Sequence, residues 1–308
     1  MNELRKMFQP DKKLYPFESH WLDIAGQRMH FLDEGPSDAP VVLMVHGNPT
    51  WSFYYRNLVL ALRDRYRCIV PDHIGCGLSD KPTDAEYRYT LEQRIADLGT
   101  LIEHVNPVKP VHMIVHDWGG MIGFGWAATR SDRVASMVIA NTAAFPLPEE
   151  KKLPAALWLV RNTMLGAFLV QGFNAFSAIA ARVAFKKPVS AEVRKGYTAP
   201  YDSWSNRIAT LRFVQDIPLG ENDPGYKIVQ ETERHLAEFA TKPCLLVWGE
   251  KDFVFDLHFL NKWRHIYPDA KVLSYPDCGH YIFEDAGQVL TQAVCDFIDS
   301  HEHGIEQN

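Results

Sequence analysis

The chain has 308 residues, of which 46% are hydrophobic and 23% charged, and its formal net charge is −6. This length suits one large α/β domain with an inserted subdomain, and the hydrophobic content is enough for a sizeable core. The negative charge is spread without a basic cluster. Nucleic acid is therefore excluded as a partner class, because binding to phosphates depends on Lys and Arg.

The five cysteines are odd in number and show neither a CxxC spacing nor a nearby pair of histidines, which predicts no disulfide framework and no zinc site. Residues 1–14 are charged and lack the apolar stretch of a signal peptide. The most apolar later region, residues 153–185, is interrupted by polar side chains. We therefore expect a cytoplasmic protein without a metal or other cofactor. The apolar region fits a pocket lining or a contact with a membrane surface, and the sequence leaves both open.

Eight apolar runs predict strands, and from the third run onward the gaps carry helical patterns such as 91–103 and 120–130. This alternation is typical of a mostly parallel sheet covered on both faces. The first two runs, joined at Gly26-Gln27, are interpreted as an antiparallel hairpin at one edge. The predicted strands are residues 21–24, 29–32, 41–45, 68–71, 111–115, 136–140, 244–248 and 271–275.

A long segment without a strand signal separates the sixth and seventh predicted strands. We interpret residues 145–223 as a helical cap, and residues 1–144 and 224–308 as the core domain. In an open α/β sheet the ligand lies beyond the carboxyl ends of the strands. A cap inserted at this edge would cover the site and exclude water.

The strand at 111–115 runs directly into the motif HDWGG at 116–120, followed by a helical pattern. This order is typical of a nucleophile elbow, a sharp turn that raises one side chain above the sheet. The usual G-x-S-x-G pattern is altered twice, since Val115 replaces the first glycine and Asp117 occupies the nucleophile position. Alone, Asp117 is better explained as a helix cap, but its expected partners favour a nucleophile.

A carboxylate nucleophile forms an ester, and opening that ester requires a general base that activates water. His280 follows the last predicted strand in a glycine-containing turn, on the same edge as Asp117. Asp252 follows the seventh strand and is predicted to orient the imidazole of His280. Asp256 is the competing carboxylate, four residues further along. The position after the sixth strand reads NTA at 141–143 and offers no carboxylate.

The segment HGNPTWSF at 46–53 follows the third strand and fits an oxyanion-hole loop. The backbone N–H groups of Asn48 and Trp118 would stabilise a negative oxygen formed during hydrolysis. The Asn48 amide and the Trp118 indole N–H are also donors that could converge on an anionic leaving group. The alternative interpretations are a turn-stabilising asparagine and a core tryptophan.

Four motifs together resemble the haloalkane dehalogenase family over nearly the whole chain: HGNPT at 46–50, PDHIG at 71–75, GLSDKP at 77–82 and HDWGG at 116–120. The resemblance implies the α/β-hydrolase fold, with an eight-stranded, mostly parallel sheet and an inserted helical cap. It also implies Asp117 as nucleophile, His280 as base and Asp252 as acid, with Asn48 and Trp118 as the leaving-group pair.

A closer resemblance is to the β-lactone decarboxylases of bacterial long-chain olefin biosynthesis. It is carried by NTAAFPLP at 141–148, APYDSWSNR at 199–207 and FVQDIP at 213–218. This subgroup converts long-chain cis-β-lactones to cis-alkenes and carbon dioxide, and works beside a lactone-forming enzyme. The apolar stretch with Phe168, Phe173 and Phe176 suits two alkyl chains, although ordinary core packing also explains it.

Three other functions stay open on the sequence. A haloalkane dehalogenase would use the same five residues. An epoxide hydrolase would use Tyr197 and Tyr201 to protonate the opening ring, but that family usually carries an aromatic residue in place of Asn48. A non-catalytic ligand receptor on the same fold is the third alternative.

Overall fold

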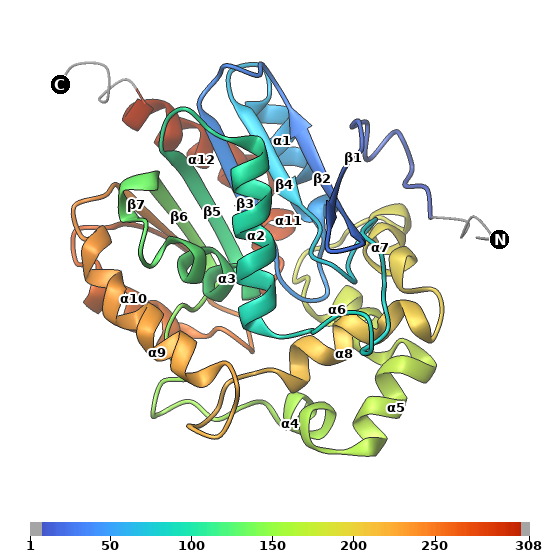
Figure 1. Cartoon of the computed structure of the whole chain (residues 1–308). Coiled ribbons are helices and arrows are strands. Elements are labelled where there is room, and N and C mark those ends of the chain that lie inside the picture. The colour runs from blue at the N-terminus through green and yellow to red at the C-terminus, as the bar shows by residue number, and fades with distance from the viewer. Residues whose placement is uncertain (1–7, 303–308) are drawn as a thin grey trace.

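An eight-stranded sheet forms the centre of the protein in a computed structural model, which describes residues 8–302 (Figure 1). The strand order is β1-β2-β4-β3-β5-β6-β7-β8; β2 is antiparallel to β1 and β4, and the other pairs are parallel. All eight predicted strands are confirmed, to within two residues at either end. They are β1 (His20–Ile24), β2 (Gln27–Glu34), β3 (Val41–Val45), β4 (Arg67–Pro71), β5 (Val111–Asp117), β6 (Val134–Thr142), β7 (Cys244–Gly249) and β8 (Lys271–Tyr275).

The predicted hairpin at the sheet edge is also confirmed. Ile24 of β1 pairs with Gln27 of β2, and the two residues between them, Ala25 and Gly26, have φ angles of 52° and 85°. Two consecutive positive φ angles are the geometry that a two-residue hairpin turn requires. The hairpin forms one edge of the sheet, separated by β4 and β3 from β5, which carries Asp117.

Helices cover both faces of the sheet, which explains why the strands read as continuous apolar runs. In β3, Val41, Leu43 and Val45 pack into one core cluster, whereas Val42 and Met44 pack into the other. The first cluster lies under α2 (Leu91–Val105), α3 (Trp118–Ala127), α9 (Tyr226–His235) and α10 (Leu257–Ile266). The second lies under α1 (Arg56–Leu62), α11 (Ile282–Asp285) and α12 (Gly287–Glu302).

Five helices lie between β6 and α9 and form a separate layer at one end of the sheet (Figure 1). No strand interrupts them in the described part of the chain, as the cap interpretation requires. The division at residues 145 and 223 stays a prediction. The helices are α4 (Ala155–Asn162), α5 (Met164–Phe173), α6 (Ala175–Val183), α7 (Ala191–Thr198) and α8 (Ile208–Gln215).

Short 3₁₀ turns complete the secondary structure, at Ser52–Tyr55, Ser131–Arg133, Ala199–Tyr201, Ser205–Arg207 and Leu236–Phe239. Within residues 8–302, no single helix is long and apolar enough to cross a membrane. The pair α5 and α6 reaches that length and composition only together, across a bend of 77°.

The first turn of α3 packs so closely on β3 that it tolerates only glycine. A Cβ atom at Gly119 would lie 2.0 Å from the carbonyl oxygen of Val45. We therefore expect Gly119→Ala to lower the free energy of unfolding by about 1–3 kcal/mol or more, the usual cost of overpacking a core. Urea denaturation measures the change.

Gly99→Ala in α2 is the matched control, because its Cβ would meet nothing closer than 3.6 Å. It should leave stability unchanged or raise it by about 0.5–1 kcal/mol, since alanine favours helix over glycine. Equal stability of the two variants would contradict the close approach of α3 to β3.

Candidate active site

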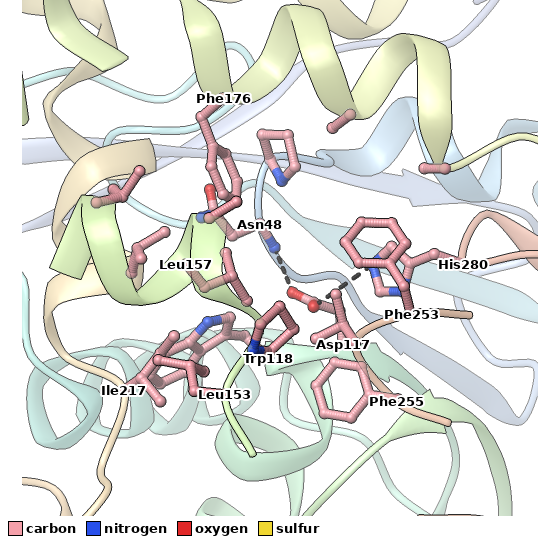
Figure 2. A pocket seen from close by; sticks show the side chains of 18 of the residues that line it. Asn48, Asp117, Trp118, Leu153, Leu157, Phe176, Ile217, Phe253, Phe255 and His280 are labelled. Carbon is pink, nitrogen blue, oxygen red and sulfur yellow. Dashed lines mark hydrogen bonds and ion pairs between the residues drawn. The ribbon is translucent and has the colours of Figure 1, made fainter. Parts of the chain in front are cut away.

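Asp117 is the last residue of β5 and has a strained backbone conformation. Its φ and ψ angles are 53° and −127°, and α3 begins at the next residue. A non-glycine residue rarely adopts a positive φ, and such strain persists only where the surroundings enforce it. The turn directs the carboxylate away from the sheet core and into a pocket, beside Asn48 and His280 (Figure 2). The predicted elbow geometry is therefore present.

Backbone N–H groups hold the carboxylate of Asp117. The N–H of Asn48 donates to Oδ1 at 2.6 Å, and the N–H of Trp118 also donates to the carboxylate. Gly47 permits this approach, because a Cβ there would lie 2.0 Å from Oδ1. Burial raises the pKa of Asp117, and the neighbouring His280 and the two N–H groups offset only part of this rise.

His280 connects Asp117 to Asp252. Its Nε2 lies 3.5 Å from Oδ2 of Asp117, and its Nδ1–H donates to Oδ2 of Asp252 at 2.8 Å. Burial disfavours the charged imidazole, but the carboxylates of Asp252 and Asp117 together outweigh this effect and raise the pKa of His280 above its usual value. An imidazole between two carboxylates has the geometry of a nucleophile, a base and an orienting acid.

Asp252, rather than Asp256, contacts the histidine. Its Oδ1 accepts backbone N–H groups from Val254 and Phe255, at 2.8 and 3.2 Å. Asp256 instead caps α10 and pairs with the Lys151 ammonium at 2.6 Å. The structure thus brings Asp117, His280 and Asp252 into one chain of contacts, as the strand order predicts.

Asn141, which was not predicted as a site residue, holds Asp252 in place. Its Nδ2 donates to Oδ2 of Asp252 at 3.0 Å, and its Oδ1 accepts the backbone N–H of Gly249 at 2.8 Å. It is fully buried, with a φ of 35°. The sequence offers no carboxylate at this position, and the orienting role of the amide becomes visible only in the structure.

Two further residues fix the loop that carries His280. The carbonyl of His280 accepts a hydrogen bond from Nε2 of His116 at 2.8 Å. The pKa of His116 lies well below its usual value, because the ring is buried and His280 lies nearby. The buried carboxylate of Asp285 accepts the N–H of Gly279 at 2.7 Å. The same carboxylate accepts the N–H groups of Lys186 and Lys187, just beyond α6. No local sequence signal marks either residue.

Asn48 and Trp118 both line the pocket, but their side chains are engaged differently from the expectation. The Asn48 amide donates to the carbonyl of Thr210 in α8 at 3.0 Å, and its Oδ1 is buried without a hydrogen-bond partner among the described residues. The Trp118 ring packs against Phe213, with ring centroids 5.3 Å apart. Convergence of the two side chains on a leaving group stays a prediction.

The pocket above Asp117 has a volume of about 270 Å³ and a mostly apolar lining. Leu153 and Leu157 from the α4 region, Phe176 from α6, and Ile217 and Phe253 from flanking loops surround the carboxylate (Figure 2). Such a lining suits an apolar ligand that presents one electrophilic group to Asp117. The described residues contain no group of three or more His, Cys, Asp or Glu side chains that could hold a metal.

The aromatic residues suggested by the sequence lie only partly at the pocket. Phe176 lines it, whereas Phe168 and Phe173 lie on the outer side of α5 with 51% and 67% of their surface exposed. For these two, neither a pocket lining nor core packing is correct. Tyr197 and Tyr201 are buried outside the pocket lining, and the Tyr197 hydroxyl donates to Glu284. These tyrosines therefore cannot protonate a ring that Asp117 attacks, which removes the main support for an epoxide hydrolase.

A family model described as "alpha/beta hydrolase fold" matches residues 40–287. The chain belongs to the α/β-hydrolase-fold family. Within this family it is 54% identical to the cis-3-alkyl-4-alkyloxetan-2-one decarboxylase of Shewanella oneidensis, over 94% of the chain and 91% of that protein. It is 47% identical to the protein of the same name from Xanthomonas campestris, over 92% of the chain and 97% of that protein.

A solved structure with the same fold is haloalkane dehalogenase DbeA from Bradyrhizobium elkani. Its TM-score is 0.83 at 25% identity, covering 94% of the chain and 99% of that structure. In sequence the chain is thus more similar to the two decarboxylases than to this dehalogenase, and the resemblance to both groups is confirmed.

The environment of His280 in this α/β hydrolase makes a pKa prediction. Burial lowers the pKa of His280, and the carboxylates of Asp252 and, to a smaller extent, Asp117 reverse that effect. Asp252→Asn should therefore move the pKa of His280 from above its usual value of about 6.5 to below it. An NMR titration of the imidazole protons measures the shift. Asp256→Asn is the control and should leave this pKa in place; a similar fall in both variants would refute the assignment of Asp252.

Proposed function

We propose that the protein is a β-lactone decarboxylase that converts cis-3,4-dialkyl-oxetan-2-ones to cis-alkenes and carbon dioxide, with Asp117 as nucleophile. The main support is the 54% identity, over 94% of the chain, to a protein named for this substrate class. The apolar pocket above Asp117 agrees with it, because two alkyl arms need an apolar environment while the lactone ring must reach the carboxylate.

The proposed reaction has two steps. A carboxylate oxygen of Asp117 attacks the ring carbon that bears the ring oxygen, and that carbon–oxygen bond breaks to leave a free substrate carboxylate. The carboxylate then departs as carbon dioxide, its electron pair forms the alkene, and Asp117 is expelled. Inversion in the first step, followed by departure of the two groups from opposite sides, leaves the alkyl arms cis. Neither step consumes water or a proton. An apolar pocket that excludes water therefore favours decarboxylation over hydrolysis of the ester.

The neighbouring groups have distinct proposed roles. His280, oriented by Asp252, stabilises the ionised form of Asp117 and would activate water if the ester were hydrolysed instead. The Asn48 amide and the Trp118 indole N–H would bind the oxygen that gains charge as the ring opens. For Asn48 this requires the second amide hydrogen, since the first donates to Thr210.

The second candidate is a haloalkane dehalogenase, favoured by the shared fold with DbeA and by the same arrangement of Asp117, His280 and Asp252. Hydrolysis would release halide and leave an alcohol. Incubation with a bromoalkane and with a long-chain cis-β-lactone, followed by separate assays for bromide and alkene, distinguishes the two. Rapid bromide release without alkene would reverse the ranking.

The nucleophile predicts the effect of a single substitution. Asp117→Asn keeps the shape of the side chain and removes its nucleophilic charge, so alkene formation from a cis-β-lactone should fall by at least about 10³-fold. Gas chromatography of the products measures it. Asp256 lies outside the chain of contacts with His280, so the control Asp256→Asn should form alkene at the wild-type rate. Alkene formation at the wild-type rate by Asp117→Asn would end the proposal.

The pocket predicts substrate length. Leu157 of α4 lines the cavity, so Leu157→Trp should reduce turnover of lactones with long arms about tenfold while sparing those with short arms. Ala155→Trp at the exposed start of the same helix is the control, since Ala155 does not line the cavity. Comparison of kcat/KM across chain lengths measures the effect, and a uniform loss at every length would show that Leu157 does not set the limit.

The proposed setting is the cytoplasm, in agreement with five free and buried cysteines. We further propose association with the enzyme that forms the lactone, because a strained ring is best transferred without exposure to water.

A further inference from the structure

Large apolar side chains are concentrated on the outside of helices α4–α6. Of fourteen that are exposed in the described part of the chain, eight lie within residues 158–204. A group of exposed apolar side chains marks an interaction site, whereas single exposed apolar residues need no explanation. The eight are Trp158, Met164, Leu165, Phe168, Phe173, Ile179, Val183 and Trp204.

Six of these residues, Trp158, Met164, Leu165, Phe168, Phe173 and Trp204, are called the cap patch below. The ring of Phe168 contacts Phe173 and Trp204, at centroid distances of 5.6 and 6.0 Å, so residues from α5 and the later turn meet on one surface. Met164 and Leu165 precede Phe168 on the same helix. The helices α4 and α5 form the outer border of the molecule at the bottom of Figure 1.

Exposed apolar side chains also border the pocket. Ile179 and Val183 of α6 and Phe253 after β7 line the pocket and are also 53%, 39% and 45% exposed. On its inner side α5 contributes Leu169 and Val170 to the pocket lining. One pair of helices thus presents apolar side chains to the pocket on one side and to the exterior on the other.

Residues 151–191, which include helices α4–α6, carry a net positive charge, opposite to that of the whole protein. No Asp or Glu lies between Glu150 and Glu192, whereas six Lys and Arg do, in a chain of net charge −6. Three of the six, Lys151, Arg161 and Lys187, pair with acids from other segments. The other three, Lys152, Arg182 and Lys186, are exposed, and among residues 8–302 no acid lies within salt-bridge distance of them.

We propose that the cap patch docks on the surface of a bilayer that contains anionic phospholipids, with α5 and α6 lying in the plane of the interface. Acyl chains would receive the Phe, Leu and Met side chains, the two tryptophans would lie at the headgroup level, and anionic headgroups would bind the three unpaired cations. The helices do not cross the bilayer. With 10 and 9 residues each is about 15 Å long, half the apolar thickness of about 30 Å.

This orientation presents the pocket mouth to the lipid. A lactone with two alkyl arms would reach Asp117 from the bilayer along Ile179, Val183 and Phe253 without crossing water. That consequence rests on the proposed function, whereas the docking itself does not.

Flotation of the full-length protein with vesicles tests the docking. The protein should float with phosphatidylglycerol–phosphatidylcholine vesicles and much less with phosphatidylcholine alone. The triple variant Leu165→Glu, Phe168→Glu and Phe173→Glu removes apolar contacts outside the pocket lining, and should lower vesicle binding about tenfold or more. The control Val108→Glu with Val289→Glu changes exposed apolar residues outside the patch, and should float like the wild type.

The charge contribution is tested separately. Lys152→Glu with Arg182→Glu should abolish the preference for phosphatidylglycerol while keeping the apolar patch. Circular dichroism establishes that each variant is folded.

Binding of the triple variant at the wild-type level would overturn the proposal, as would a wild type that stays at the bottom of the gradient. Light scattering tests whether the patch instead binds a second copy of the chain. A wild type that binds no vesicles and forms an oligomer, which the triple variant converts to monomers, would show that it does. Vesicle binding uses no lactone, so its failure would leave the decarboxylase proposal intact, and failure of alkene formation would leave the docking intact.

Discussion

The site depends on keeping one carboxylate in an apolar environment. Burying a charge is unfavourable unless hydrogen bonds and a counter-charge compensate, and each neighbour of Asp117 supplies part of this compensation. The backbone N–H of Asn48 donates to the carboxylate, and His280 provides a charge that Asp252 stabilises. The strained elbow and the close glycine contacts at Gly47 and Gly119 serve the same requirement, because this backbone path brings the N–H groups within reach of the carboxylate.

Much of the fold could be predicted because it follows from burial on two faces. Strands covered by helices on both sides must be apolar throughout, and they read as such in the sequence. The predicted carboxyl ends of β5 and β6 were two residues short, because β5 continues into His116 and Asp117, and β6 into Asn141 and Thr142. Polar residues at these ends resemble loop residues in sequence, although the structure pairs Asp117 with Thr142 as neighbouring strand positions.

The site was predictable as far as strand order fixes it. Parallel strands bring their carboxyl ends to one edge, so residues that follow β3, β5, β7 and β8 meet there. The supporting contacts could not be predicted, because they join segments far apart in the chain: Asn141 and Asp252 are 111 residues apart. Helical periodicity likewise does not tell which side of a helix between β6 and α9 faces the pocket, so the sequence did not distinguish Phe176, which lines the pocket, from the exposed Phe168 and Phe173.

Asp285 links substrate entry to the integrity of the site. Its carboxylate holds the backbone beside His280 and, through Lys186 and Lys187, the chain leaving α6, whose residues border the mouth of the pocket. Lifting α6 as a rigid lid would strip hydrogen bonds from a buried anion and disturb the imidazole at the same time. The less costly way to admit a bulky ligand is rotation of the Ile179 and Val183 side chains. The mouth of the pocket can therefore widen by side-chain rotation while the backbone around it stays fixed.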